Sequence, residues 1–434
     1  MPQWFKRGSK EHVSQLKNVS STLRWVQVFS SIFSLGVFEF PHGKQRRYFT
    51  ALYIAFATTG YFTSILFGVS NGYIYKALGI GIIVSVYVNY INIVMAAVCV
   101  VICLYKYSAM RTSQTKIDNI DKTLHSLGIS RTYRKEFMTN IKLTIAFIMI
   151  DIILHAVTSY LFLFNLNLLE AVAVASFFNY PFQISLALDL VFITNNGLIS
   201  TRLKKMNIFM EDTIKTVMEP VNTWKFNSQT DSRVTKIKII NSDLIRLKFI
   251  SSAVQAIRQA HQELCDIARE LNEQLSVQVT VEMAGCFGLF TGLLYNLYVT
   301  LVSHHDSIIA KVNSVVSLSL WSLVYIGKVF FINRSCAIAV VEAKKIGEII
   351  HELDSPIIND ELRNEVHQFA LQMVQNPLIF TGCGFFSLNY SFVQSFVGSV
   401  TTYLVILIQM SKIPSKPDVP TELSTIYENS TEWW

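Results

Sequence analysis

Seven long apolar stretches dominate the pattern of hydrophobic and polar positions along this chain. Each has about the 20 residues that a helix needs to cross the hydrocarbon core of a bilayer. They lie at residues 48–70, 77–104, 140–164, 169–194, 276–302, 312–333 and 391–410. Lipid offers no partner for the backbone of an open strand, and the alternation of a β-barrel is absent. The pattern therefore predicts an all-α integral membrane protein with seven transmembrane helices.

A shorter apolar segment at residues 25–40 is interrupted by Gln27, Ser30, Ser31 and Ser34. We interpret it as an amphipathic helix at the membrane interface or on its cytoplasmic side, because it is too short to cross a bilayer. If it did span, the asymmetry of basic residues described next would disappear.

The composition excludes a soluble protein and the charge distribution orients the chain. Hydrophobic residues make up 51% of the sequence and charged residues only 15%, against roughly 25% charged in soluble proteins. Of the 37 Lys and Arg residues, 31 lie before the first span and in residues 105–139, 195–275 and 334–390. Basic loops stay cytoplasmic, so we expect a cytoplasmic N-terminus and an extracellular C-terminus. The net charge of +7 is explained by this topology and does not indicate nucleic acid as a partner.

The segment between the fourth and fifth spans has its own heptad pattern. Leu247, Val254, His261, Ala268 and Leu275 recur every seven residues, and Ile250, Ile257, Leu264 and Leu271 follow three places behind. This a/d pattern predicts a helix that runs straight into the fifth span and packs in a cytoplasmic bundle. We interpret His261 as a packed, hydrogen-bonded residue of that seam, and residues 219–235 as a polar loop.

The predicted organisation follows from the spans and the charges. It comprises a cytoplasmic segment with the short amphipathic helix (1–47), four spans (48–194), a cytoplasmic loop and heptad helix (195–275), two spans (276–333), a cytoplasmic anchor segment (334–390), the seventh span (391–410) and an extracellular tail (411–434).

Motifs of enzymatic chemistry are absent from the sequence: there is no nucleophile elbow, zinc motif, P-loop or dinucleotide fingerprint. His304-His305-Asp306 are adjacent and cannot easily converge on one metal ion. We therefore expect neither an enzyme nor a bound cofactor or metal. Ionisable residues inside spans are costly, and here snorkelling or mutual pairing is the alternative to ion handling; they are Lys142, Asp151, Asp189, Glu282 and Lys328.

Neutral polar and aromatic residues gather in the outer halves of four spans. They are His155, Thr158 and Tyr160, then Asn179, Tyr180 and Gln183, then Tyr295 and Asn296, and finally Ser317, Trp321 and Tyr325. Aromatic walls with a few hydrogen-bonding groups suit a small-molecule pocket that opens outward. An interfacial aromatic belt with interhelical hydrogen bonds is the alternative for any single residue.

The last span carries a specific signature. Residues 402–409 read TYLVILIQ and, with FTGCGFFSL at 380–388, resemble the closing motif of insect gustatory receptors, in the insect seven-transmembrane chemoreceptor superfamily. The resemblance implies a tastant-gated, non-selective cation channel in the plasma membrane of sensory neurons. It implies a homotetramer, or a heteromer with related receptors, whose seventh helices line one pore. Gln409 and Met410 would lie at the gate, where Met410 replaces the family's Phe.

The spacing of the last span agrees with a pore helix. Thr402, Ile406, Gln409 and Met410 share one helical face, so four copies around an axis would stack polar and apolar rings. The ligand stays open between a bitter plant metabolite and a sugar, although Leu404 stands where the family's sugar branch tends to have Glu. A G-protein-coupled receptor-like sensor and a small-solute transporter remain alternative functions.

Overall fold

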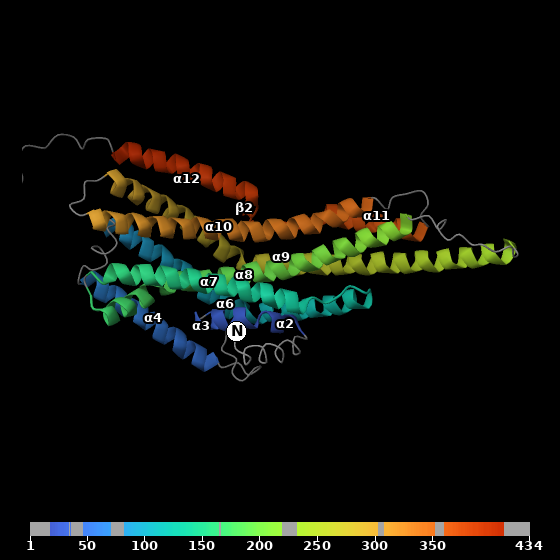
Figure 1. The fold of residues 1–434 in the computed structure, drawn as a ribbon, viewed down its shortest axis with the longest axis horizontal. Helices are drawn as coiled ribbons and strands as arrows, with labels where there is room; N and C mark the ends of the chain where they lie inside the picture. Colours follow the sequence, from blue (N-terminus) through green and yellow to red (C-terminus); the bar gives the residue numbers. More distant parts are fainter. Residues whose placement is uncertain are drawn as a thin grey trace, which may run out of the picture.

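The computed structural model describes residues 18–33, 35, 47–70, 82–164, 166–218, 232–302, 308–351 and 360–411. Its helices are α2 (Val19–Thr22), α3 (Arg24–Ile32), α4 (Arg47–Ser70), α6 (Ile82–Ser126), α7 (Tyr133–Phe162), α8 (Leu168–Met218), α9 (Ser232–Val302), α10 (Ile308–His351), α11 (Asp360–Gln375) and α12 (Tyr390–Ser411). Figure 1 shows the long helices side by side along the long axis of an elongated molecule. The expected His304–Asp306 loop and most of the expected tail lie outside the described residues.

Several helices are long and apolar enough to cross a membrane. Five such helices occur in the described part of the chain, namely α7, α8, α9, α10 and α12, and α6 contains a shorter apolar segment, Tyr90–Ile102. The predicted spans 48–70 and 77–104 fall on α4 and α6, except for residues 77–81, which are not described. The protein is thus a multi-pass membrane protein, while seven crossings and their orientation remain a prediction.

The helices α8, α9 and α10 continue well past the inner ends of their predicted spans. α9 is one unbroken helix of 71 residues, so the heptad segment does run directly into the fifth apolar stretch. It begins at Ser232, so residues 232–235 of the predicted polar loop are helical, and the rest of that loop, residues 219–231, lies outside the described residues. From Ile250 onward the predicted heptad seam is confirmed by burial, whereas the side chain of its first member, Leu247, is not described. The buried members are Ile250, Val254, Ile257, His261, Leu264, Ala268, Leu271 and Leu275.

The first half of the short amphipathic segment predicted at 25–40 forms α3, which packs on α7 and α8; residues 34 and 36–40 lie outside the described part. Val26 and Phe29 are buried, whereas Trp25 is exposed, so one apolar face is covered by the bundle. The preceding α2 is tied down by polar contacts: the Val19 N–H donates to Asp118 Oδ1 (2.7 Å), and Asn140 Nδ2 donates to the Thr22 carbonyl (3.2 Å).

A β-hairpin departs from the predicted all-α fold. Its strands β1 (Thr381–Gly382) and β2 (Phe386–Ser387) pair antiparallel. The turn between them needs positive φ at two successive residues, Cys383 (48°) and Gly384 (79°), as in the tight turns that suit the twist of a hairpin. Two-residue strands are too short for the alternation that would predict them.

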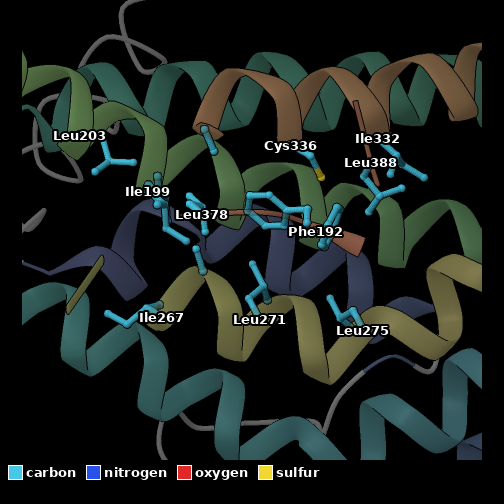
Figure 2. Close-up of a cluster of buried hydrophobic side chains, with 14 of the residues drawn as sticks. Phe192, Ile199, Leu203, Ile267, Leu271, Leu275, Ile332, Cys336, Leu378 and Leu388 are labelled. Atoms are coloured by element: carbon cyan, nitrogen blue, oxygen red, sulfur yellow. The ribbon is translucent and has the colours of Figure 1, made fainter. Parts of the chain in front are cut away.

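The segments flanking the hairpin anchor it in the core of the bundle. Leu378 and Leu388 are buried, and Figure 2 shows them beside Phe192 of α8, Leu271 of α9 and Cys336 of α10. The hairpin therefore fixes the start of α12 against three long helices.

Candidate functional site

The last helix, α12, docks on the rest of the chain through a narrow aromatic face. Phe396 and Val400 are buried. The Phe287 ring of α9 makes edge contacts with Phe396 and Tyr403, at centroid distances of 5.7 and 5.6 Å, and Phe290 stacks on Phe396 at 6.4 Å. Edge-to-face pairs of this kind stabilise helix packing beyond the area they bury. Figure 1 shows α12 along the outer edge of the bundle.

The four residues predicted to line a pore lie on the part of α12 that its own chain leaves uncovered. Thr402, Ile406, Gln409 and Met410 are all exposed, Met410 by 63%. Thr402 donates its hydroxyl hydrogen to the Gly398 carbonyl of the same helix (3.1 Å). An exposed stripe on an apolar helix is available to lipid or to neighbouring subunits.

Two of the predicted pocket residues join an aromatic cluster between α8 and α10. Trp321 and Tyr325 stack at 6.0 Å, and the Phe182 ring makes edge contacts with both, at 5.1 and 5.7 Å. The Tyr325 hydroxyl donates to Asn92 Oδ1 of α6 at 3.5 Å. Phe182 is not among the pocket residues predicted from the sequence. The one sequence feature that could have indicated it is its position directly before Gln183, on a helix with polar residues in its outer half.

A second group of predicted pocket residues meets between α7 and α8. Gln183 Nε2 donates to Asp151 Oδ1 (2.9 Å), and His155 Nε2 lies 3.4 Å from Ser176 Oγ. Asn179 is buried, yet neither of its amide atoms has a hydrogen-bond partner within the described residues. A buried amide without partners costs free energy.

The other predicted pocket residues do not join these two groups. Thr158 donates to the Leu154 carbonyl (2.9 Å) and Asn296 Nδ2 to the Gly292 carbonyl (2.8 Å), each within its own helix. Tyr295 is half-buried and Ser317 is buried. Tyr160 is 48% exposed and makes an edge contact with Phe164.

A cavity of about 320 Å³ lies between α7, α8 and α10. Its wall is apolar apart from Asp189 and Lys328, and none of the predicted ligand-binding residues lines it. Pattern reading did not find this cavity, because it depends on which helices are neighbours. The lining comprises Phe147, Ile150, Ile153, Leu154, Leu186, Asp189, Ile193, Leu320, Leu323, Val324, Gly327, Lys328 and Phe331.

A buried ionic cluster ties α8, α9 and α10 together next to this cavity. Lys328 Nζ lies 2.6 Å from Glu282 Oε1 and 3.2 Å from Asp189 Oδ2. The structure therefore shows mutual pairing for Lys328, Glu282 and Asp189. Asp151 instead accepts from Gln183, and Lys142 is exposed.

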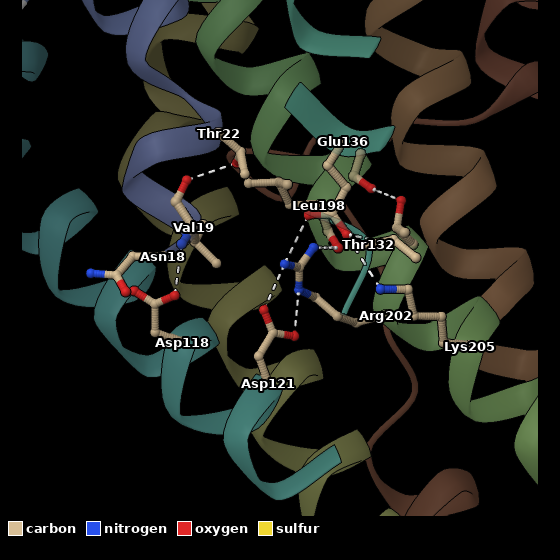
Figure 3. A network of polar contacts seen from close by, with 12 residues as sticks. Asn18, Val19, Thr22, Asp118, Asp121, Thr132, Glu136, Leu198, Arg202 and Lys205 are labelled. Atoms are coloured by element: carbon tan, nitrogen blue, oxygen red, sulfur yellow. Dashed lines mark hydrogen bonds and ion pairs between the residues drawn. The ribbon is translucent and has the colours of Figure 1, made fainter. Parts of the chain in front are cut away.

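A second buried ionic cluster lies in the predicted cytoplasmic bundle (Figure 3). Arg202 donates through Nε and Nη2 to both Asp121 oxygens (3.1 and 2.8 Å), and Nη2 also donates to Glu136 Oε2 (3.0 Å). Its Nη1 donates to the Leu198 carbonyl (3.0 Å). This arrangement satisfies a fully buried guanidinium, and it joins α6, α7 and α8.

Comparison with known proteins identifies the class. The sequence profile described as 7tm Chemosensory receptor matches residues 23–413. The chain belongs to this family of chemosensory receptors. It is a member of the insect gustatory and chemoreceptor superfamily, as its last span indicated.

The similar curated proteins are gustatory receptors of Drosophila melanogaster. The chain is 28% identical over 177 residues to "Gustatory receptor for bitter taste 66a", covering 39% of this chain and 32% of that protein. It is 23% identical over 159 residues to "Gustatory receptor for sugar taste 43a", covering 37% and 36%. These alignments span about a third of each relative's length.

Two solved structures share the fold. The insect olfactory receptor OR5 from Machilis hrabei has a TM-score of 0.62 at 14% identity, covering 89% of this chain and 97% of that one. The same receptor in complex with eugenol has a TM-score of 0.55 at 16% identity, covering 89% and 98%.

Proposed function

We propose that this chain is the pore-forming subunit of a tastant-gated, poorly selective cation channel in the plasma membrane of sensory neurons. The observation that carries the proposal is the exposure of α12. This apolar helix carries Gln409 near its predicted outer end. Apart from the docking face around Phe396 and Val400, most of its surface is not buried by other parts of the chain. A polar Gln409 turned to lipid would be costly, and a water-filled path shared with other subunits removes that cost.

In this proposal four copies, or this chain with related receptors, surround one axis with their α12 helices. Thr402, Ile406, Gln409 and Met410 then form stacked rings. Apolar rings close a pore by dewetting, and a ring of amides replaces part of an ion's hydration shell without strong selection among cations. The flexible thioether of Met410 supplies an apolar ring at the outer end.

The proposed ligand site lies among the outer halves of α6, α7, α8 and α10. Trp321, Tyr325 and Phe182 supply aromatic surface, and the unpartnered amide of Asn179 and ring nitrogen Nδ1 of His155 supply hydrogen-bonding groups. This combination suits a small, flat or ring-shaped molecule. Eugenol in the olfactory receptor OR5 is a small ligand of this kind. One similar protein is described as a receptor for bitter taste and another as a receptor for sugar taste, so the proposal includes both bitter compounds and sugars.

The test is patch recording from cells that express this chain alone, against a panel of bitter compounds and sugars. We expect a tastant-evoked cation current whose unitary conductance changes in Gln409→Ala. Gln394→Ala is the matched control, because Gln394 is also exposed on α12 but lies near its inner end. Tastant-evoked current of equal size in cells without the protein contradicts the proposal.

A further inference from the structure

The cavity between α7, α8 and α10 opens sideways, toward the region where the predicted spans meet lipid. Leu323 at its mouth is 67% exposed, and Ile153 and Phe331 are exposed beside it. Phe147 and Leu154 form part of the buried wall. A hydrophobic molecule dissolved in the bilayer can therefore reach the cavity without crossing the protein.

One carboxylate interrupts this hydrocarbon wall. Asp189 lines the cavity and is only 2% exposed. Neither of its oxygens accepts a hydrogen bond of acceptable geometry from any described residue, although Lys328 Nζ lies 3.2 Å from Oδ2. Buried carboxylates are normally paired and hydrogen-bonded, so this one lacks donors.

The neighbouring lysine is already engaged by another carboxylate. Glu282 accepts from Lys328 Nζ at 2.6 Å, from the Ser185 hydroxyl at 2.8 Å and from Gln278 Nε2 at 2.5 Å. Lys328 also donates to Ser185 Oγ at 2.8 Å. Two carboxylates thus share one ammonium group, and Asp189 is the one left in excess. A buried carboxylate without full compensation is neutralised either by a proton or by a second cation, and the apolar cavity beside Asp189 leaves room for the cation.

We propose that this cavity binds a small hydrophobic amine in its ammonium form, which enters from the bilayer and donates an N–H hydrogen bond to Asp189. The volume of about 320 Å³ falls within the range of small-ligand sites. The apolar wall holds the hydrocarbon part of the amine, and its charge balances the cluster. The site is separate from the proposed outer ligand pocket, and its test does not depend on channel activity.

Photolabelling of the purified full-length receptor tests the proposal. The probes are a hexylammonium ion carrying a diazirine on its alkyl chain and the alcohol with the same diazirine-bearing chain. We expect the ammonium probe to label the cavity-lining segments of α7, α8 and α10 at a concentration roughly tenfold lower than the alcohol, because the alcohol cannot neutralise Asp189. Unlabelled hexylammonium should compete. Asp189→Asn should abolish the difference between the probes.

A second variant keeps the test independent of the charge cluster. Gly327 lines the cavity, and a Cβ built there meets nothing within 4 Å, so Gly327→Leu extends a side chain into the cavity from an unobstructed position and removes a glycine from a helix interior. We expect it to fold and to lose labelling by both probes. Gly197→Leu is the matched control, because Gly197 has the same free space but does not line the cavity.

Two results overturn the proposal. Equal labelling by the ammonium and alcohol probes would identify the cavity as a groove for lipid chains. Undiminished ammonium labelling in a folded Gly327→Leu receptor would place the amine elsewhere.

Discussion

Arg202 is the residue on which the polar interior of the predicted cytoplasmic bundle depends. It is fully buried and forms ion pairs with two buried carboxylates, Asp121 and Glu136, from two other helices. Removing one partner of a buried ion pair leaves uncompensated charge, which costs about 3–5 kcal/mol.

We therefore expect Arg202→Met to lower the free energy of unfolding by about 3–5 kcal/mol and to reduce the melting temperature of the solubilised receptor. Lys205→Met is the control, because Lys205 lies 3.4 Å from Glu136 but is partly exposed and should cost about 1 kcal/mol or less. Equal losses in the two variants would contradict the assignment.

His261 makes the stability of the bundle depend on pH. It lies in α9 well before the predicted fifth span, donates from Nε2 to the Ala343 carbonyl (3.1 Å) and packs against Phe369. Burial lowers the pKa of His261 from 6.5 to about 4. As pH falls from 6.5 toward 4, the unfolded chain takes up a proton that the folded chain does not, so stability is lost in that range.

The expected loss is at most about 3 kcal/mol, from a pKa difference of roughly 2.5 units. Thermal melts between pH 7.5 and 4.5 measure it. His261→Gln should flatten the dependence in this range, whereas His367→Gln should not, because His367 is exposed. An unchanged profile in His261→Gln would refute this role.

At the residue scale, the sequence predicted which face of a helix each residue occupies but not what lies opposite. Burial of the heptad residues and the grouping of Trp321 with Tyr325 follow from spacing within one helix. The pairing of Lys328 with Glu282, and the cavity beside Asp189, depend on contacts between helices far apart in the chain. Helical periodicity carries no information about those neighbours.

At the scale of elements, α12 depends on few anchors for its position. Phe396 contacts Phe287 and Phe290 of α9, so Phe396→Ala should cost about 3–5 kcal/mol and loosen α12. Increased cleavage by a protease before Tyr390 measures the loosening. Val397→Ala is the control, because Val397 is the next residue and is exposed; a similar effect there would count against Phe396 as the anchor.

The hairpin turn gives a second prediction at this scale. Cys383 has a φ of 48°, a conformation that costs a residue with a Cβ about 1 kcal/mol but is free for glycine. We expect Cys383→Gly to stabilise the receptor by up to about 1 kcal/mol and Cys383→Val to destabilise it, since β-branched residues tolerate positive φ worst. Melting temperatures of the two variants check the order, and the reverse order would disprove it.

The long apolar helices could be predicted because their pattern extends over about 20 residues or more. The hairpin could not, because two-residue strands show no periodicity. Helix starts were less well predicted, as the beginning of α9 at Ser232 shows.

At the scale of the whole molecule, the proposed channel requires an assembly. A chain that exposes most of α12 should purify with other subunits, and we expect native mass spectrometry to find four chains per particle. Particle images should show a fourfold axis with α12 nearest to it. A stable single-chain particle, or an assembly in which α12 lies on the outside, would rule out the shared pore.

Because α9 is one unbroken helix, it connects the docking surface of α12 rigidly to the heptad bundle. At about 1.5 Å per residue, its 71 residues form a rod roughly 105 Å long, with the docking surface of α12 near one end and the heptad bundle along the other. Bending such a rod sharply requires breaking backbone hydrogen bonds. A small tilt where α12 rests on Phe287 would therefore become a much larger sideways displacement at the opposite end of α9.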